Sequence, residues 1–485
     1  MKRIIALSLS LALGAPAAAC AQNAPPPAQT PGLAPRPSPA DARARAAAVW
    51  ALIKASGFSG AVRIDIGEDT ILRDAAGFAD ASTQRPFTPD TQFEIGSLTK
   101  PFTAAAILAL QDEGRLSTND PLSKFFPDLP ADKASITLHQ LLTHSAGFPL
   151  VIPPVGAGNS DLDPVGRAEF LRRAFATPLL FEPGSRIEYS NGNYSLLAAV
   201  VEIVSGQDYE TYLKTRILAP AGARHTGYGS VLDDANAVHA PDGRGIVECC
   251  WAEGGPYWNV LGNGGLMSTL DDFVTWRRAF AHGRIVSPAA VRQAGTGWVA
   301  EKDGPGKEGY GWIIATSPTR GRVELAAGGN RYFTTEMLYY PDYDMVVLAT
   351  SNGGQSPGAV TRRLVAAMFG EPDVAAPVGP RPSEAALANA FAAALLDPDA
   401  TDRHAFIAEK AGPVFVSREG IPAISARFDA LHESVAGSRV VDVAVGQDRL
   451  VRITLRMPSG ETHVVEFGLG GSGNEPRIAG FSQLN

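Results

Sequence analysis

The chain contains little cysteine, three residues in 485, and this scarcity excludes several kinds of protein. Cys249 and Cys250 are neighbours in the sequence, and neighbouring cysteines can bridge only through a strained ring, so we expect no structural disulfide framework. No histidine or further cysteine stands beside them at the spacing of zinc ligands, which argues against a metal site there.

Basic runs and long apolar stretches are absent as well. The formal net charge is -8, and an acidic chain without a cluster of basic residues is not expected to bind nucleic acid. Beyond the N-terminus, no apolar stretch has the length of a transmembrane helix. The composition, 45% hydrophobic and 19% charged, is that of a globular protein. Because 485 residues are too many for one compact core, we expect two folded units with tails.

The N-terminus has the pattern of an export signal. Lys2 and Arg3 supply positive charge, residues 4–13 form a short apolar run, and small residues follow as far as Ala21, as at a cleavage site. We therefore predict a signal peptide over residues 1–21 and a periplasmic or secreted protein. Cys20 leaves one alternative open: if it carries a lipid, the chain is anchored to a membrane.

Two proline-rich stretches divide the rest of the chain. Residues 22–40 are rich in proline and alanine, and residues 371–382 contain four prolines. Neither stretch has the apolar residues that a core needs, so residues 22–40 are predicted to be a disordered linker and residues 371–382 a second linker. The folded units are then expected at 41–370 and 383–485.

Strand patterns stand at both ends of the larger unit, and helical patterns fill its middle. This order favours one sheet built from the two chain ends, with an inserted helical domain and a ligand crevice between them. In the smaller unit, helices precede alternating strands, which predicts an α+β domain. The expected strands of the larger unit are 60–66, 71–77, 311–315, 323–326, 335–340 and 345–350, and its expected outer helices are 42–56, 97–112 and 360–369.

Ser97 and Lys100 form the only pair in which a lysine follows a serine by three positions. Residues three apart share a helix face, so a buried Lys100 with a lowered pKa can take the proton of Ser97. Gly96 precedes the pair and Pro101 follows it, which places Ser97 at the start of a helix. Free N–H groups and the helix dipole face the reacting atoms there. The alternative is a serine N-cap beside an exposed lysine.

Tyr189 and Asn191 form a second candidate pair. A tyrosine can pass a proton to a leaving group, and an asparagine can hold a substrate amide. The same spacing recurs at Tyr257 and Asn259, so the pattern alone does not decide between the two pairs. A loop tyrosine packed on the core is the simpler interpretation of Tyr257.

These motifs together resemble the serine β-lactamase and penicillin-binding-protein superfamily, above all the class C β-lactamases, D-alanyl-D-alanine carboxypeptidases and related esterases. The resemblance implies a β-lactamase-like α/β (α+β) fold, with an antiparallel sheet flanked by helices and an inserted helical domain, followed by a small C-terminal α+β domain. It covers about residues 55–370. The matching segments, in the family's order, are Ser97-Leu98-Thr99-Lys100, Leu141 to Gly147, Phe181 to Ser185, Tyr189-Ser190-Asn191, Gly264 to Thr269 and Tyr310-Gly311-Trp312.

The resemblance also implies a role for each candidate residue. Ser97 is the nucleophile and Lys100 its base. Tyr189, rather than Tyr257, helps to protonate the leaving group, and Asn191 orients the substrate. No metal and no organic cofactor is implied.

Other polar residues near these motifs receive structural roles. His144 lies in a segment that the resemblance implies to be structural, so a hydrogen-bonded packing role is expected in place of membership in a catalytic triad. Asp271 and Asp272 are expected to be charges at a helix N-terminus.

One motif departs from the family. The third motif usually reads Lys or His, a small residue and Gly on a strand that lines the site, and we place Ala327 at its basic position. Gly328 and Gly329 permit close backbone approach, and the N–H of Asn330 is predicted to pair with that of Ser97 as an oxyanion hole. A regular strand would put Arg331 on the face of Ala327.

The missing cation makes an ester or an uncharged amide a better expected substrate than a penicillin. The sequence thus predicts an exported serine hydrolase that acts on a small-molecule or peptide substrate, which is an ester, a peptide or a β-lactam. The alternative is a degenerate protein that binds or senses wall peptides or β-lactams. The oligomeric state is not predicted.

Overall fold

The structure is a computed structural model of the chain. It describes residues 32–153, 164–240, 243–251, 255–301, 306–330, 332–353, 356–373, 382–412, 415–416, 419–445, 450–471 and 476–484. The expected signal peptide and most of the first linker lie outside these residues, and helix α1 (Pro39–Ala55) begins within the last part of that linker. In the described ranges, no helix has both the length and the apolar character needed to cross a bilayer.

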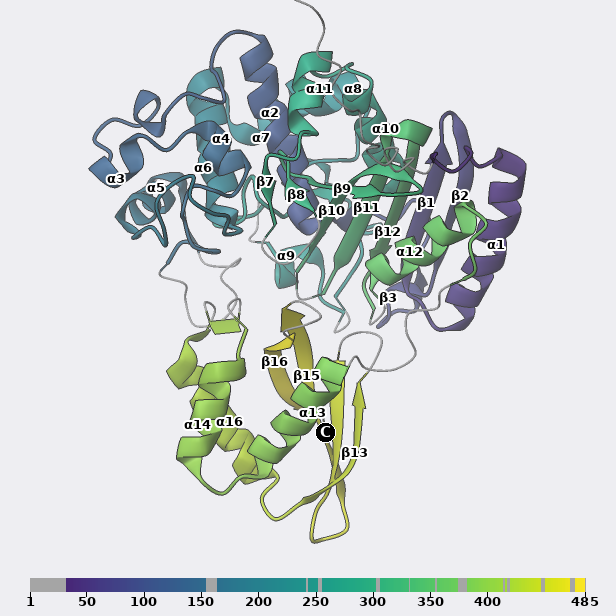
Figure 1. The fold of residues 1–485 in the computed structure, drawn as a ribbon, viewed down its shortest axis with the longest axis vertical. Coiled ribbons are helices and arrows are strands. Elements are labelled where there is room, and N and C mark those ends of the chain that lie inside the picture. Colours follow the sequence, from purple (N-terminus) through teal and green to yellow (C-terminus); the bar gives the residue numbers. More distant parts are fainter. Residues whose placement is uncertain are drawn as a thin grey trace, which may run out of the picture.

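An eight-stranded antiparallel sheet forms the centre of the larger unit (Figure 1). The strand order is β2-β1-β12-β11-β10-β9-β8-β7, so the first two strands pair with the last one and the two chain ends build one sheet, as expected. The strands are β1 (Gly60–Ile66), β2 (Asp69–Ala76), β7 (Val299–Ala300), β8 (Lys307–Glu308), β9 (Ile313–Ser317), β10 (Gly321–Gly329), β11 (Thr334–Tyr340) and β12 (Met345–Ser351).

Helices cover both faces of this sheet. Helices α1 and α12 (Pro357–Met368) pack together on one face, and α2 (Lys100–Asp112) and the inserted helices lie on the other (Figure 1). The insert contains α3 (Ala131–Ala134), α4 (Leu138–Leu142), α5 (Arg167–Ala176), α6 (Asn191–Ser205), α7 (Tyr209–Tyr212), α8 (Ala219–Ala221), α9 (Ile246–Cys249), α10 (Leu270–Ala281) and α11 (Pro288–Ala294). Two short two-stranded sheets join β3 (Phe78–Asp80) to β4 (Arg85–Pro86) and β5 (Phe93–Glu94) to β6 (Met267–Ser268).

Alternation along the strands divides the core in two. On β11, Met337 packs into the cluster that contains the α2 side chains, whereas Leu338 packs into the cluster beneath α1 and α12. Successive side chains of a strand point to opposite faces of the sheet. The even-numbered residues Leu338 and Tyr340 of β11 therefore face α1 and α12, whereas the odd-numbered residues Met337 and Tyr339 face α2.

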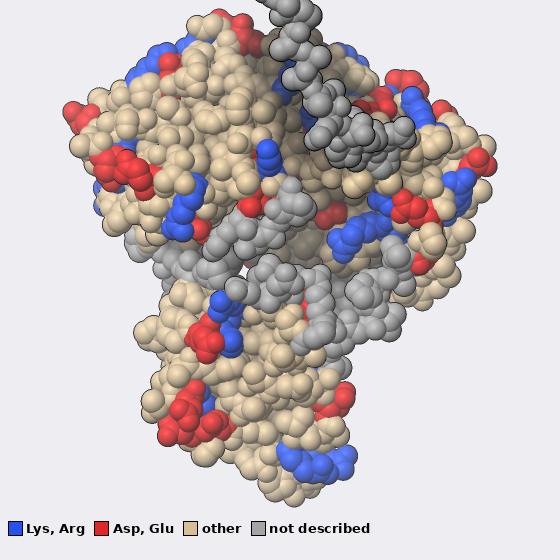
Figure 2. All heavy atoms as spheres, viewed as in Figure 1, with Lys and Arg blue, Asp and Glu red and all other residues tan. Residues whose placement is uncertain are grey.

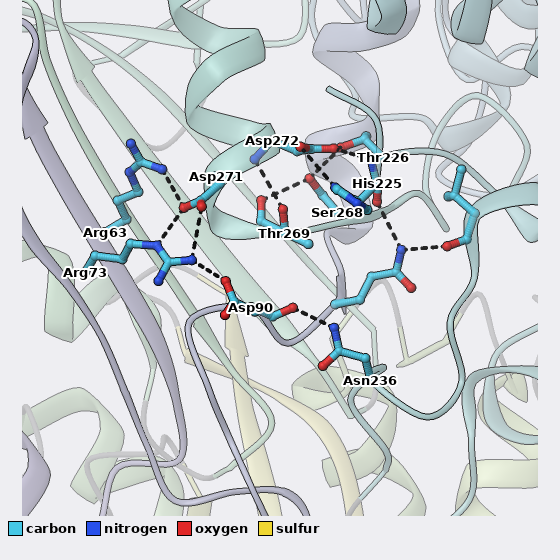
Figure 3. Close-up of polar contacts among 12 residues, drawn as sticks. Arg63, Arg73, Asp90, His225, Thr226, Asn236, Ser268, Thr269, Asp271 and Asp272 are labelled. Carbon is cyan, nitrogen blue, oxygen red and sulfur yellow. Dashed lines mark hydrogen bonds and ion pairs between the residues drawn. The ribbon is translucent and has the colours of Figure 1, made fainter. Parts of the chain in front are cut away.

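Polar side chains fasten the start of α10 to strands β1 and β2 (Figure 3). Asp271 accepts a hydrogen bond from Arg63 Nη1 at 2.5 Å and another from Arg73 Nε at 2.8 Å. The two arginines stand opposite each other on β1 and β2. One carboxylate at the helix start thus binds two strands.

The neighbouring aspartate binds the loop on the other side of the helix (Figure 3). Asp272 accepts a hydrogen bond from Thr226 Oγ1 at 3.2 Å, and its own N–H donates to Thr269 Oγ1, which caps α10. Both aspartates therefore lie in the first turn of the helix, as the sequence predicted. Strand β6 leads into α10 and pairs with β5, so this network also holds the segment that leads to Ser97.

The C-terminal part folds around a core of its own. Helix α12 ends at Met368, and α13 (Pro382–Leu396) is the next described helix. Leu387, Phe391, Phe428 and Phe467 belong to one buried cluster made only of residues after 382. The further elements are α14 (Ala400–Lys410), α16 (Ile421–Ser434) and a sheet of β13 (Arg439–Val445), β14 (Leu450–Arg456), β15 (Thr462–Gly471) and β16 (Pro476–Leu484), in that order. Helices followed by an antiparallel sheet make this part α+β, as predicted.

Charged side chains of both signs are interspersed on the face shown in Figure 2. Ion pairs of the described residues include Arg320 with Glu371 and Arg363 with Asp373. Among the described residues of that face, blue and red groups lie mostly side by side, with no broad patch of one sign.

Candidate active site

Local backbone requirements place Ser97 at the start of α2. Ser97 lies in a short 3₁₀ helix, Gly96–Thr99, that continues directly into α2. Gly96 has φ of 52°, and a Cβ there would collide with the N atom of Gly329, so the position requires glycine. Pro101 falls in the first turn of α2, where the N–H groups have no helical partner.

Lys100 is buried beside Ser97, with 2% of its surface exposed. Its Nζ donates to Ser97 Oγ at 3.1 Å, to Asn191 Oδ1 at 2.9 Å and to the backbone O of Asn263 at 2.8 Å. Burial lowers the pKa of Lys100 to about 7, against an opposing effect of the Glu308 carboxylate. A substantial fraction of Lys100 is thus neutral near pH 7, and the alternative of an exposed lysine is wrong.

Tyr189 reaches Ser97 from the other side. Its hydroxyl donates to Ser97 Oγ at 2.8 Å, and Lys100 Nζ lies 4.8 Å from the centre of its ring. Although 38% of Tyr189 is exposed, the protein packed around its hydroxyl raises the pKa above the ordinary value, so the phenol keeps its proton. Asn191 begins α6, and its Oδ1 holds Lys100.

His144 packs behind Tyr189. The two ring centres are 4.4 Å apart, and His144 Nδ1 accepts a hydrogen bond from the N–H of Ser190 at 3.2 Å. Burial, and secondarily the charge of Lys100, holds the pKa of His144 well below its ordinary value. The described hydrogen bonds link His144 to the residue after Tyr189 and none links it to Ser97, so the neutral ring positions the tyrosine.

Two glycines bring strand β10 against the start of α2. A Cβ on Gly328 would collide with the N atom of Ser97, just as one on Gly96 would collide with that of Gly329. Facing residues of antiparallel strands alternate between hydrogen-bonded and non-hydrogen-bonded pairs. The N–H of Asn330 donates to a β11-side carbonyl, Phe333 O, at 2.9 Å. Asn330 and Phe333 thus form a hydrogen-bonded pair, so the next facing pair, Gly329 and Thr334, is a non-hydrogen-bonded pair. The N–H of Gly329 therefore points away from β11, toward the turn that contains Ser97.

The sequence model of the family described as beta-lactamase matches residues 42–368. The chain belongs to the beta-lactamase family. The family match and the relatives below place it among serine hydrolases.

The relatives of this β-lactamase family chain include penicillin-binding proteins and an esterase. A penicillin-binding protein of Bacillus subtilis (strain 168) is 27% identical over 338 residues, which are 65% of this chain and 73% of the relative. The esterase EstB of Burkholderia gladioli is 31% identical over 300 residues, which are 53% of this chain and 75% of the relative. The octameric penicillin-binding protein homologue from Pyrococcus abyssi has a TM-score of 0.61 at 22% identity, over 89% of this chain and 91% of that chain. The last match shows the fold.

The third motif of the β-lactamase family lies one residue earlier than the sequence suggested. Ala326 packs with Ile95 and Leu98 in the cluster that faces α2, and Gly328, two residues on, abuts Ser97. Ala327 is exposed and stands opposite Glu336 in an unbroken register, so its side chain lies on the α12 face. Placing the basic position at Ala327 is therefore wrong, because a shift of one residue reverses the face of a strand. Ala326 occupies that position.

Asn330 serves the turn after β10. Its Oδ1 accepts hydrogen bonds from the N–H groups of Tyr332 at 2.7 Å and Phe333 at 2.9 Å, and its Nδ2 donates to Glu94. Because its N–H already binds Phe333 O, the prediction that Asn330 completes the oxyanion hole is wrong. Gly329 N–H, which points toward the turn that contains Ser97, is the donor of this strand end that lies nearest to that turn. Arg331 lies outside the described residues.

Sequence reasoning missed three groups near the site. The Asn263 carbonyl that binds Lys100 is a backbone atom, so no side-chain pattern marks it. Glu308, which interacts electrostatically with Lys100, carries a carboxyl whose pKa burial raises to about 8. Its position two residues before the Tyr310-Gly311-Trp312 segment is the sequence feature that could have indicated that Glu308 lies near the site. Cys250, within 3.5 Å of Asn330 Nδ2, is disulfide-bonded, although no structural disulfide framework was expected.

Proposed function

We propose that the chain is a hydrolase that transfers acyl groups through Ser97. One observation carries the proposal: Ser97 Oγ accepts hydrogen bonds from both Lys100 Nζ, at 3.1 Å, and the Tyr189 hydroxyl, at 2.8 Å. A serine held between a buried amine and a phenol has a proton acceptor and a proton donor in place.

The acylation step follows from these contacts. Neutral Lys100 takes the proton of Ser97 while Oγ forms a bond to the substrate carbonyl carbon. The N–H groups of Ser97 and Gly329 stabilise the negative oxygen that develops. Tyr189 donates its proton to the leaving atom as the bond to that atom breaks, and Lys100 returns a proton to Tyr189. An acyl-enzyme and a free alcohol or amine result.

In deacylation, the same groups transfer protons in the opposite direction. Water attacks the acyl carbonyl and passes a proton to the Lys100–Tyr189 pair, and Ser97 leaves as the restored hydroxyl. Asn191 keeps Lys100 in place through its Oδ1. Each group thus ends in the state in which it began.

The substrate class that we propose is a neutral carboxylic ester. Ala326 stands where the family's third motif carries Lys or His, so the residue at this position offers no cation to a substrate carboxylate. A hydrogen bond to a charged group is worth roughly 1.5–3 kcal/mol, and its loss weakens carboxylate-bearing substrates selectively. Labelling with a fluorescent fluorophosphonate and turnover of p-nitrophenyl butyrate test the activity.

The missing cation at Ala326 also favours a second candidate function, a protein that binds wall peptides or β-lactams without turnover. The two functions separate in one comparison. A hydrolase is labelled by the fluorophosphonate and turns over p-nitrophenyl butyrate, whereas a binding protein takes up a fluorescent penicillin reversibly and does neither.

Tyr189→Phe should lower turnover of p-nitrophenyl butyrate by about 10²–10⁴-fold, the range for a positioned proton-transfer group. The reason is that phenylalanine keeps the ring against His144 but removes the hydroxyl that binds Ser97. Tyr257→Phe is the matched control and should change turnover little. Steady-state kinetics at saturating ester measure both. A larger loss in Tyr257→Phe than in Tyr189→Phe would show that Tyr189 is not the proton donor.

We also propose that the chain is exported, on the strength of the charged, apolar and small-residue pattern over 1–21. Expression of the full chain in a Gram-negative host should give a periplasmic or secreted protein that starts near Gln22, or at Cys20 with a lipid attached. N-terminal sequencing and the intact mass measure this. A chain that remains in the cytoplasm and begins at Met1 refutes export.

A further inference from the structure

The two backbone donors of the proposed oxyanion hole come from segments that lie far apart in the sequence. Ser97 follows β5, whereas Gly329 ends β10. The segments meet through glycines, since a Cβ on Gly96 would collide with Gly329 N and one on Gly328 with Ser97 N. Packing of this kind sets a lower limit on the separation of the two N–H groups. A hydrogen bond, which has a preferred length and direction, fixes the separation from both sides.

One side-chain hydrogen bond joins the residues next to these donors. Asn330 Nδ2 donates to Glu94 Oε2. Asn330 directly follows Gly329, and Glu94 stands three residues before Ser97. Glu94 is buried, with 5% of its surface exposed, so water competes little for its carboxylate and the bond is strengthened.

Strand β5 gives Glu94 a rigid base. Glu94 pairs with Met267 of β6, and the N–H of Ile95 donates to Leu266 O at 2.9 Å. Because β6 leads into α10, whose start is bound to β1 and β2, the carboxylate of Glu94 is held by the central sheet. Asn330 therefore binds a fixed point and not a second loop.

Four contacts hold the amide of Asn330 in one orientation. Its Oδ1 accepts from the N–H groups of Tyr332 and Phe333, and its Nδ2 donates to Glu94 and lies 3.5 Å from Cys250 Sγ. An amide has two acceptor positions on oxygen and two hydrogens on nitrogen, so every position is used. A half-turn of the amide would place its oxygen against the carboxylate, which has no hydrogen to donate when ionised.

Gly329 needs such a restraint because glycine restricts its own backbone little. Two consecutive glycines end β10, and glycine has more accessible backbone conformations than other residues. On one side, the pairing of Ala327 with Glu336 holds the strand. On the other side, Asn330 holds it through its side chain and through its N–H, which donates to Phe333 O at 2.9 Å.

We propose that Asn330 is a positioning residue of the oxyanion hole. By binding Glu94, it holds the N–H of Gly329 where that group and the N–H of Ser97 meet the same substrate oxygen. The proposal rests on the acyl-transfer function proposed above. Negative charge develops on that oxygen in the transition state, so the contribution of Asn330 appears in kcat and not in KM.

Exchanging donor and acceptor tests the proposal. Asn330→Asp sets two carboxylates against each other and should lower kcat for p-nitrophenyl butyrate by about 10²-fold, the lower effect of losing one oxyanion-hole donor. Glu94→Gln alone keeps an acceptor for Asn330 Nδ2 and should cost less than about 10-fold. Glu94→Gln combined with Asn330→Asp restores the bond in the opposite direction and keeps the acceptor for the turn. The double variant should recover at least about 10-fold of the kcat lost in Asn330→Asp.

Asn236→Asp is the matched control. Asn236 lies beside the same strand, since its backbone O accepts from the N–H of Gln92, and its Nδ2 donates to Asp90 O at 2.8 Å. The substitution adds the same charge and removes a similar donor without touching the turn after β10. It should lower kcat less than about 10-fold, the effect of one ordinary hydrogen bond.

A second variant covers the case in which Asn330→Asp does not fold, which thermal unfolding shows. In Asn330→Ser, the hydroxyl can accept from the N–H groups of the turn but is too short to reach Glu94. Its kcat should fall by about 10-fold or more, the effect of a lost hydrogen bond to a charged group, while KM stays near the wild-type value.

The outcomes separate the inference from the function on which it rests. If the wild type neither hydrolyses the ester nor reacts with a fluorophosphonate, the proposed function fails first, and the inference fails with it. If the wild type is active and the folded Asn330 variants lose no more kcat than Asn236→Asp, Asn330 does not position the oxyanion hole. A loss confined to KM, or a double variant without recovery, refutes the role of the bond to Glu94.

Discussion

Ser97→Ala should lower kcat/KM for p-nitrophenyl butyrate by at least about 10⁴-fold, as loss of a catalytic nucleophile does in other serine hydrolases. The substitution removes one oxygen, the one to which Lys100 Nζ and the Tyr189 hydroxyl donate. The backbone N–H groups that form the oxyanion hole remain, so substrate binding should persist. The loss should therefore appear in kcat.

Ser190→Ala is the matched control. Ser190 stands next to Tyr189, is fully buried, and donates through Oγ to Pro149 O at 2.7 Å. Its loss removes a buried hydrogen bond near the site but no reacting atom, so turnover should fall less than 10-fold, about 1 kcal/mol. Thermal unfolding shows whether either variant is folded. A folded Ser97→Ala that keeps a tenth of the wild-type rate would remove Ser97 from the mechanism.

Replacing Lys100 should lower turnover by about 10²–10⁴-fold, the worth of a general base. Lys100→Met keeps the length of the side chain and removes the amine. Lys100→Arg keeps a positive charge but cannot deprotonate in a protein, so it should lose as much as Lys100→Met. Lys133→Met is the control, because Lys133 is also buried but its Nζ binds Asp132. High activity in Lys100→Arg would mean that charge, not proton transfer, is the contribution of Lys100.

The pH dependence of kcat/KM tests the same role of Lys100 in the unmodified protein. Lys100 is a base only when neutral, and its pKa lies at about 7. The rate should therefore fall about tenfold for each pH unit below that value and level off above it. A rate that stays constant from pH 5 to pH 8 would contradict a base with this pKa.

The proposed catalytic set could be selected from the sequence because each of its members is a side chain in a recognisable pattern. The three-residue spacing of Ser97 and Lys100 fixes their proximity on one helix. The glycine before them and the proline after them fix where that helix begins. Tyr189 was preferred to Tyr257 through the order of the family's motifs, and the structure places its hydroxyl on Ser97. Most strands of both units could be predicted because their apolar residues alternate between faces.

The register at the end of β10 could not be predicted. In the run Leu325-Ala326-Ala327-Gly328-Gly329, neighbouring positions carry the same small residues, so the sequence does not indicate which face each one takes. Only the packing of Gly328 on Ser97 decides it. The role of Asn330 was missed for a related reason, because the N–H that it uses in a turn belongs to the backbone. Backbone donors and acceptors, such as the Asn263 carbonyl, leave no mark in side-chain patterns.

Glu336 illustrates a different limit. Nothing in the sequence places it beside Ala327, since it lies nine positions beyond that residue in a strand that reads as core. The antiparallel register brings the two residues opposite each other, and the packing of α12 leaves a cavity over them. A cavity that forms from two strands and a helix start becomes visible only in three dimensions.

The most direct test is to locate the acyl group during turnover. The chain is mixed with p-nitrophenyl butyrate, quenched with acid within milliseconds, digested and analysed by mass spectrometry, beside Ser97→Ala treated in the same way. The account predicts a butyryl group on the wild-type peptide that contains Ser97 and none on the corresponding peptide of the variant. A butyryl group on another side chain, formed equally in Ser97→Ala, would contradict it.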